Sequence, residues 1–325
     1  MKYTEIEGIK VSKFCLGTWN ITGDSTWGYQ DEKDSIETIK TALDCGINFF
    51  DTAEMYGDGY SEKLLGKILS PIRDRVVIAS KTVKAKYDEV INACENSLKN
   101  LKTDCIDIYY IHWPSRKIPF EETVRAMEKL KEDGKIKVLA VSNFGRKDLT
   151  EILKYHPVKL NQLAYNLLFR AIEYEILPFC IEKGISVACY SPLAEGLLTG
   201  KFTSADEVPV GRARTRHFSK DRPMSQHNED GAEEETFQTI KEIKKIAEEL
   251  NISMTHISLS YLLHKNGVKV VVGGARKASQ VKENASAIDI SLSEDIMKKL
   301  DKATEKLKEK LGKNPDMWRS DSRIQ

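Results

Sequence analysis

Short apolar runs alternate with longer amphipathic stretches along the whole chain. The runs are rich in Val, Ile, Tyr and Phe and lack polar alternation, which is typical of strands buried on both faces of a parallel sheet. They cover residues 14–17, 47–51, 76–81, 106–112, 136–143, 159–166, 185–191 and 268–274. The pattern therefore predicts eight buried strands.

Helical patterns fill most of the intervals between these runs, at residues 31–45, 88–101, 120–133, 147–154 and 174–183. Gly46, Gly134 and Gly184 each follow one of them and lead into the next strand, as C-cap glycines do. Eight strands with helical crossovers predict a single α/β domain over residues 1–325, folded as a (β/α)8 TIM barrel. The alternative is a doubly wound sheet, but its usual G-x-G-x-x-G turn is absent from this sequence.

Three further segments complete the expected architecture. Residues 2–11, with Glu7-Gly8 at their centre, predict an N-terminal β-hairpin at the bottom of the barrel. Residues 203–231 form one long irregular segment, and loops of that length are usually functional or disordered. Residues 293–311 predict a charged C-terminal helix, which is followed by a tail.

Composition narrows the class of protein. The chain has 325 residues with 50 Lys+Arg and 49 Asp+Glu, and a formal charge of +1 argues against nucleic-acid or anionic-membrane partners. No apolar stretch reaches the ~20 residues of a membrane span, and the first residues lack the apolar region of a signal peptide. The six cysteines include no C-x-x-C pair, so we expect reduced thiols and no metal site. We therefore expect a soluble cytoplasmic protein with a small-molecule substrate; the sequence leaves the oligomeric state open.

Polar residues end the apolar runs at regular intervals. Asp51, Lys81, His112 and Ser142 are separated by 30, 31 and 30 positions, close to the length of one βα unit. Because barrel enzymes place their chemistry at the C-terminal ends of the strands, these side chains should meet at one mouth. Tyr56 follows in the loop after Asp51. A tyrosine becomes a useful acid near neutral pH when a cation such as Lys81 stabilises its phenolate, so the group is suited to protonating a substrate oxygen.

Six fragments in order resemble the aldo-keto reductase superfamily. They are residues 46–66, containing Asp51 and Tyr56, then 78–82, 111–114, 141–145, 190–196 and 273–284. The resemblance implies a catalytic tetrad of Asp51, Tyr56, Lys81 and His112, in which Tyr56 acts as general acid or base. It also implies an NADPH-dependent carbonyl reductase acting on an aldehyde or ketone. The alternative is a cofactor-binding regulatory module similar to the potassium-channel β subunits.

The same resemblance implies a cofactor site and a substrate pocket. Its cofactor-contacting positions are Thr18, Trp19, Asp51, Ser142, Asn143, Gln162, Tyr190, Ser191, Leu193, Gly196, Lys201, Arg212, Gly274, Arg276, Gln280, Glu283 and Asn284. Arg276 matches a position that faces the adenosine 2′-phosphate, so NADP(H) is preferred, with NAD(H) as the alternative cofactor. Substrate would lie among aromatic and tetrad side chains, namely Trp19, Trp27, Tyr56, His112 and Trp113.

Overall fold

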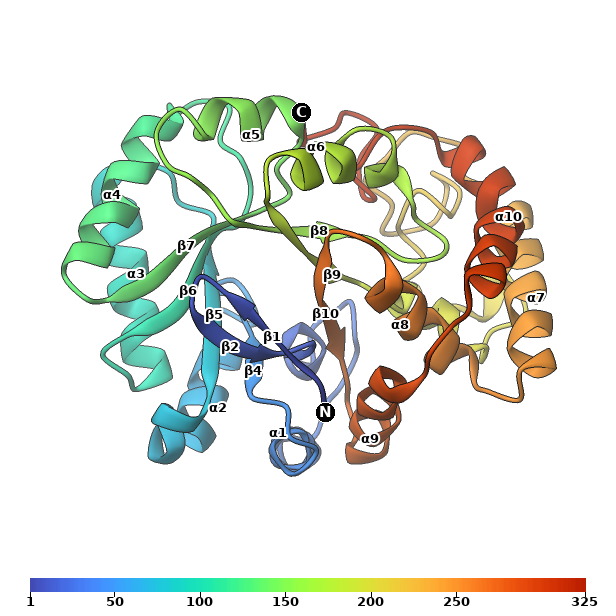
Figure 1. Cartoon of the computed structure of the whole chain (residues 1–325), viewed down its shortest axis with the longest axis horizontal. Helices are drawn as coiled ribbons and strands as arrows, with labels where there is room; N and C mark the ends of the chain where they lie inside the picture. Colours follow the sequence, from blue (N-terminus) through green and yellow to red (C-terminus); the bar gives the residue numbers. More distant parts are fainter.

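Eight parallel strands close into a barrel in the order β10-β3-β4-β5-β6-β7-β8-β9 (Figure 1). The computed structural model describes all 325 residues. The barrel strands are β3 (Phe14–Gly17), β4 (Phe49–Asp51), β5 (Val77–Thr82), β6 (Ile106–Ile111), β7 (Ile136–Ser142), β8 (Leu160–Ala164), β9 (Ser186–Tyr190) and β10 (Val268–Gly274). Each coincides with a predicted apolar run, so the predicted (β/α)8 barrel is confirmed.

Helices surround the barrel. They are α1 (Glu32–Asp44), α2 (Tyr60–Leu69), α3 (Tyr87–Leu101), α4 (Phe120–Glu132), α5 (Arg146–Ile152), α6 (Ile176–Glu182), α7 (Glu233–Glu249), α8 (Met254–His264), α9 (Ala278–Ser286) and α10 (Glu294–Leu311). Gly46, Gly134 and Gly184 have φ of 77°, 73° and 65°, the left-handed geometry that ends a helix before a strand. Figure 1 shows α7 and α10 packed side by side at one edge of the molecule. None of the helices has the length and apolar character needed to cross a membrane.

The predicted N-terminal hairpin covers the barrel's N-terminal end. Strands β1 (Tyr3–Ile6) and β2 (Ile9–Ser12) pair antiparallel. Ile6 and Val11 from the hairpin are buried in the same apolar cluster as the barrel interior. Asn48, just before β4, accepts the Ser12 amide at 2.7 Å and donates to the Lys10 carbonyl at 2.9 Å. Because the hairpin closes this end, access to the barrel interior is left to the opposite mouth.

Alternating side chains divide the apolar core into two parts. On β6, Tyr109 packs in the layer between strands and helices, whereas Tyr110 points into the barrel. This alternation is the two-residue period of a strand. After α10 the chain runs back across the barrel to α5, where the backbone of Gln325 exchanges hydrogen bonds with Asp148 (Figure 1). The C-terminal segment 312–325 therefore lies over the open mouth.

Candidate active site

Four polar side chains meet where β4, β5 and β6 end at the open mouth. Nζ of Lys81 binds Oδ1 of Asp51 at 2.5 Å and the carbonyl of Thr52 at 2.7 Å. The same Nζ lies 3.4 Å from the Tyr56 hydroxyl. The His112 ring packs edge-on against Tyr56, with ring centroids 6.1 Å apart. The structure thus brings Asp51, Tyr56, Lys81 and His112 together as one cluster, here called the tetrad.

The ionisation of Lys81 and Tyr56 is governed by burial and by their mutual contact. Burial alone disfavours the Lys81 ammonium, but Asp51 and Tyr56 outweigh it, so the pKa of Lys81 is raised. Burial raises the pKa of Tyr56, and the Lys81 charge opposes that rise. Lys81 is fully buried, so its charge acts on the phenol with little screening by water. The tyrosine therefore holds its proton next to a charged lysine.

His112 is held neutral in this cluster. Burial, then the charges of Lys81 and Arg323, set the pKa of His112 well below its ordinary value. Its Nδ1 is buried without a hydrogen-bond partner. The backbone carbonyl of His112 accepts the side-chain amide of Asn143 at 3.1 Å. A neutral imidazole can donate to a substrate oxygen without adding a second cation beside Lys81.

A hydrogen-bonded polar ring links the tetrad to the ends of β7, β8 and β9. The amide of Gln162 donates to Oδ2 of Asp51 at 2.8 Å. The Tyr190 hydroxyl donates to the Asn143 side chain at 2.9 Å, and the Asn143 amide also reaches Oγ of Ser142 at 3.1 Å. Asn143 adopts φ of 63°, a left-handed conformation that asparagine tolerates better than most residues. Four of the predicted cofactor residues therefore lie beside the tetrad.

Thr18 connects this ring to β3. Its hydroxyl donates to the backbone carbonyl of Asp51 at 2.8 Å and contacts Oγ of Ser61 at 2.7 Å. The buried Thr18 side chain is thus already engaged by protein partners and supports the backbone that carries Asp51.

Aromatic rings form the rim above Tyr56. Trp19 stacks on Tyr56 at 6.0 Å and 20°, and its indole N–H donates to Asp24 at 2.9 Å. Trp27 packs edge-on against Trp19 at 5.4 Å. Trp318, from the C-terminal segment, lies 6.3 Å from Trp19 on another side. The predicted Trp19 and Trp27 are therefore at the mouth, and the tail adds an aromatic residue that the sequence had not singled out.

The tail also covers Trp113. The guanidinium of Arg323 lies 3.6 Å from the centroid of the Trp113 ring. Asp316 fixes this arginine through Nε at 2.7 Å and a terminal nitrogen at 2.9 Å. Arg323, Asp316 and Trp318 escaped prediction because the tail shows no periodic pattern; the only sequence signal was an aromatic and charged composition.

Three cations gather on the β9–β10 side of the mouth. A Cβ on Gly196 would lie 3.1 Å from Nζ of Lys201 and 3.3 Å from a terminal nitrogen of Arg212, so both side chains converge on this glycine. Burial, then Arg212 and Arg276, lower the pKa of Lys201. None of the ion pairs of the structure involves Lys201, Arg212 or Arg276. Mutually repelling cations that form no ion pair fit a polyanionic ligand such as a dinucleotide.

The backbone before these cations is unusual. Ser191, Ala194 and Glu195 have φ of 49°, 46° and 54°, all left-handed, where β9 leads into the 3-10 helix η4 (Ala194–Thr199). Such conformations in residues other than glycine cost free energy and cluster at functional sites. The carbonyl of Ser191 is held by Asn166 at 2.9 Å. Leu193 lies within this turn and packs against the core.

The remaining predicted cofactor residues lie at the end of β10 and on α9. Arg276 donates to Gln30 at 2.7 Å, to the carbonyl of Trp27 at 2.8 Å and to that of Tyr29. Gln280 accepts the Arg276 amide at 2.8 Å. The side-chain amide of Asn284 donates to the Gly274 carbonyl at 3.3 Å. The carboxylate of Glu283 accepts the Ser253 hydroxyl at 3.0 Å. Arg276 therefore bridges the end of β10 and the loop that carries Trp27.

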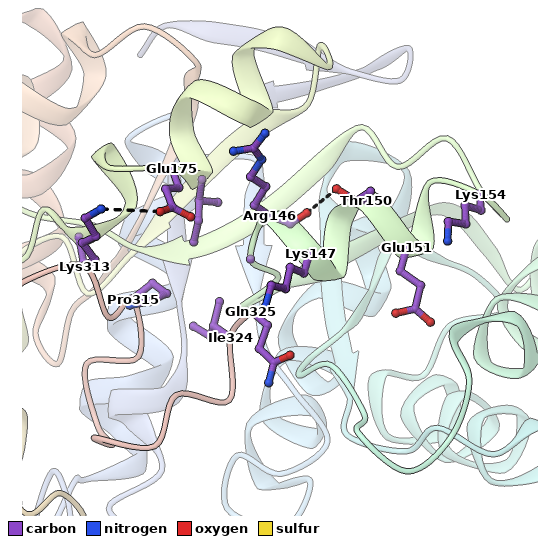
Figure 2. A pocket seen from close by; sticks show the side chains of 13 residues that line it. Arg146, Lys147, Thr150, Glu151, Lys154, Glu175, Lys313, Pro315, Ile324 and Gln325 are labelled. Atoms are coloured by element: carbon purple, nitrogen blue, oxygen red, sulfur yellow. Dashed lines mark hydrogen bonds and ion pairs between the residues drawn. The ribbon is translucent and has the colours of Figure 1, made fainter.

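A hollow of about 690 Å³ lies away from the tetrad, beside α5 and the tail (Figure 2). Its lining includes Gly145, Ile324 and Gln325, and Lys313 pairs with Glu175 across it at 4.0 Å. It contains none of the predicted site residues. No group of three or more His, Cys, Asp or Glu side chains in the molecule is arranged to hold a metal ion.

Known proteins share both the sequence and this architecture. The sequence profile of the aldo/keto reductase family matches residues 13–305. An aldo-keto reductase of Bacillus subtilis, YhdN, is 36% identical over 296 residues, which are 86% of this chain and 87% of the relative. An NADH-specific methylglyoxal reductase of Escherichia coli is 32% identical over 327 residues, 92% of this chain and 97% of the relative.

Solved structures agree with this assignment. The glycerol dehydrogenase AKR11B4 of Gluconobacter oxydans superposes with a TM-score of 0.81 at 31% identity, covering 94% of this chain and 95% of that one. A Klebsiella pneumoniae aldo-keto reductase in complex with NADPH gives 0.72 at 30% identity, covering 91% and 92%. The family profile spans most of the barrel, including the tetrad. The chain therefore belongs to the aldo/keto reductase family and is an NAD(P)H-dependent oxidoreductase.

Proposed function

We propose that this protein is an NADPH-dependent reductase of aldehydes or ketones in which Tyr56 is the general acid. The observation that carries the proposal is the contact between the Tyr56 hydroxyl and the buried, Asp51-bound ammonium of Lys81, at 3.4 Å. A positioned acid beside a fixed cation is the arrangement needed to protonate an oxygen that gains negative charge.

Each tetrad residue has a distinct task in this mechanism. Bound NADP(H) supplies or accepts the hydride. Tyr56 gives its proton to the carbonyl oxygen, and Lys81 stabilises the phenolate that remains. Asp51 keeps Lys81 charged and in place. Neutral His112 donates a hydrogen bond to the same oxygen; in alcohol oxidation the proton returns to Tyr56.

The resemblance to the family implies the cofactor residues, and the charges around the mouth support it. Lys201 and Arg212 would meet the pyrophosphate at the turn formed by Ser191, Leu193 and Gly196. Asn143, Gln162 and Ser142 would hold the carboxamide beside Tyr190, while Thr18 and Trp19 border the nicotinamide. Arg276, with Gln280, Glu283, Asn284 and Gly274, would take the adenosine end and favour NADP(H). The NADPH complex of the Klebsiella neighbour supports this preference, and the relative named NADH-specific keeps NAD(H) as an alternative.

Substrate would enter between aromatic side chains at the mouth. Trp19, Trp27 and Trp113 surround Tyr56 and His112 with apolar surface, which suits the body of a small aldehyde or ketone. The carbonyl oxygen would then face Tyr56 and His112.

Turnover measured beside cofactor binding tests the proposal. Absorbance of the reduced cofactor is followed with a panel of generic aldehydes and ketones, using NADPH and NADH separately, and binding of each cofactor is titrated by fluorescence. The proposal expects turnover with a preference for NADPH. Tight NADPH binding without turnover of any carbonyl compound would instead favour a regulatory module similar to the potassium-channel β subunits.

A further inference from the structure

Arg214 is a cation at the mouth to which the proposed mechanism gives no role. It belongs to the irregular segment 203–231 and lies beside two aromatic rings of the rim. Its guanidinium carbon is 4.7 Å from the Trp318 ring centroid and 5.7 Å from that of Trp19. Trp19 itself stacks on Tyr56 at 6.0 Å, so the guanidinium and the proton donor contact the same ring.

The hydrogen-bonding capacity of Arg214 is unused. Its Nε is buried and has no partner, and the ion pairs of the structure do not include it. Arg323, which lies over Trp113, is by contrast bound twice by Asp316. A buried donor without an acceptor costs free energy, so native structures pair nearly all such donors with protein, water or a ligand.

A second orphan donor lies next to the same ring. The indole Nε1 of Trp27 is buried without a partner, and Trp27 packs on Trp19 at 5.4 Å. Both orphan groups are donors only, since neither a guanidinium nor an indole N–H accepts hydrogen bonds. The missing partner must therefore supply acceptor oxygens.

The carboxylates of Glu195 and Asp24 do not provide the missing acceptor. Glu195 is close enough for Arg214 to stabilise its charged form, yet both of its oxygens are also buried without hydrogen-bond partners. Asp24 is engaged by Trp19 and by the Thr26 amide at 2.9 Å. The positive charge of Arg214 is therefore available to a ligand.

We propose that the carbonyl substrate of this protein carries an oxyanion group, a carboxylate or a phosphate, and that Arg214 binds this group. The inference rests on the proposed function, because it places the substrate carbonyl at Tyr56. A guanidinium binds such oxyanions through a two-pronged fork. Its contacts with the Trp19 and Trp318 rings hold this fork at the mouth before the substrate arrives. Arg214 is thus a specificity-determining residue, and Trp27 supplies a supporting donor.

Matched aldehydes test the proposal. Wild-type enzyme with saturating NADPH is assayed with 4-carboxybenzaldehyde, 4-formylphenyl phosphate and the neutral 4-carbamoylbenzaldehyde. We expect kcat/KM to favour at least one anion over the amide by about 10- to 100-fold, mostly through KM, as one charge-assisted fork allows. Arg214→Met should remove that advantage while changing the neutral substrate little, and Arg214→Lys should restore part of it. The anion with the larger loss identifies the preferred oxyanion.

The control variant is Arg75→Met, which removes an exposed arginine just before β5, at the far end of the barrel. Arg75→Met should leave the preference for anionic aldehydes unchanged, because it lowers the net charge as Arg214→Met does but changes no side chain at the mouth. Three results would overturn the proposal: no anion preference in wild type, an equal loss for all three aldehydes in Arg214→Met, or the same loss in Arg75→Met.

A binding measurement separates this inference from the proposed function. Tryptophan fluorescence of the NADP-bound protein is titrated with 4-(hydroxymethyl)benzoate, 4-(hydroxymethyl)phenyl phosphate and 4-(hydroxymethyl)benzamide. If no aldehyde is reduced, the proposed function fails, yet an Arg214-dependent preference for either anion over the amide would still support the anion site. Equal binding of the three alcohols would reject it.

Discussion

The side-chain amide of Gln162 donates to Oδ2 of Asp51 at 2.8 Å, from β8 to β4 across the barrel mouth. The other oxygen of Asp51 accepts Lys81 at 2.5 Å. Both oxygens of this buried carboxylate are therefore fixed, one by an amide and one by a cation. The position of Lys81 under Tyr56 consequently depends on Gln162, a residue that the family resemblance connects only with the cofactor.

Replacing Gln162 with leucine should destabilise the tetrad. The change leaves Oδ2 of Asp51 buried without its donor, which costs about 1–3 kcal/mol. We expect a lower thermal unfolding midpoint in the absence of cofactor. The same substitution in an Asp51→Asn background should cost clearly less, because the carboxylate is gone. An equal loss in both backgrounds would show that Gln162 acts on stability independently of Asp51.

Tyr56→Phe should abolish most of the activity while leaving the cofactor site intact. It removes one hydroxyl, and positioned acid catalysis typically contributes about 10²–10⁴-fold to the rate. We expect kcat for aldehyde reduction to fall by at least about 10²-fold and fluorescence-monitored NADPH binding to change little. Lys81→Met should also lower kcat, since it removes the charge that stabilises the phenolate. Retention of most of the wild-type kcat in Tyr56→Phe would mean that another group donates the proton.

The barrel was predictable because its signal is local and repeated. Each buried strand appears as an apolar run, and the residue that ends it reaches the mouth. Helix α8 gave no such signal because it is buried almost all round and so has no polar face. Helix α2 was missed because its inward face carries Ser61 and Glu62, both fully buried, with Glu62 bound by Ser80 at 2.6 Å. A buried polar face cannot be recognised from hydrophobic periodicity.

The site was predictable only in part. The tetrad follows from strand ends and family motifs, and the structure brings its four residues together. Arg214, Glu195 and Trp318 lie in segments without periodicity, where the sequence does not say which side chains turn toward the mouth. Their positions depend on long-range packing, such as Trp318 against Trp19, that no local pattern encodes.

Arg276 should determine the preference between the two cofactors. NADPH carries a 2′-phosphate that NADH lacks, and a charge-assisted contact to it is worth about 1.5–3 kcal/mol. We expect wild type to bind NADPH more tightly and Arg276→Ala to lower the NADPH/NADH affinity ratio by at least about tenfold. Arg276→Ala also removes an anchor of the loop at Trp27, which should affect both cofactors alike. The ratio of the NADPH and NADH affinities therefore tests the assignment better than either affinity alone.

The control for that experiment is Gln30→Leu. Gln30 accepts Nε of Arg276 at 2.7 Å, so its removal loosens the same loop contact without removing the charge. This variant should change the two cofactor affinities by similar factors. Equal wild-type affinities, or an unchanged ratio in Arg276→Ala, would contradict the assignment.

Glu195 should make stability depend on pH. Burial raises the pKa of Glu195 to about 7, although Arg214 and Arg212 oppose the rise, whereas the ordinary value is 4.5. Between about pH 4.5 and 7 the folded chain therefore holds a proton on Glu195 that the unfolded chain has released. The contribution of Glu195 to the free energy of unfolding falls as pH rises through this range and is constant above it. The total loss is about 3 kcal/mol.

The isosteric variant Glu195→Gln isolates this effect, because its amide carries no proton to lose. We expect it to unfold at a higher temperature than wild type at pH 8, with the difference shrinking at pH 5. Thermal melts of both proteins across this range provide the measurement. A constant offset between the two curves would show that Glu195 does not titrate in this window.

Gly145, just before α5, leaves the space in which the end of the tail lies. A Cβ on this residue would lie 2.2 Å from the backbone oxygen of Gln325, closer than van der Waals contact allows. Any residue can adopt its φ of −84°, so only the steric clash with the tail excludes a side chain here. Gly145→Ala should therefore displace the segment that carries Trp318 and Arg323. We expect a cost of about 1–3 kcal/mol, typical of overpacking, and a higher KM for carbonyl substrates.

A chain that ends at Ile324 provides the matched background for this prediction. Removing Gln325 loses its backbone exchange with Asp148, but it also removes the atoms that the new methyl group would strike. If the tail is the obstacle, Gly145→Ala should cost markedly less stability in the shortened chain than in the full one. Thermal melts of the full and the shortened chain, each with and without Gly145→Ala, measure how far the two changes depend on each other. KM for one aldehyde measures whether substrate binding at the mouth changes. Equal penalties in the two backgrounds would place the clash within α5 itself and would separate the tail from substrate binding.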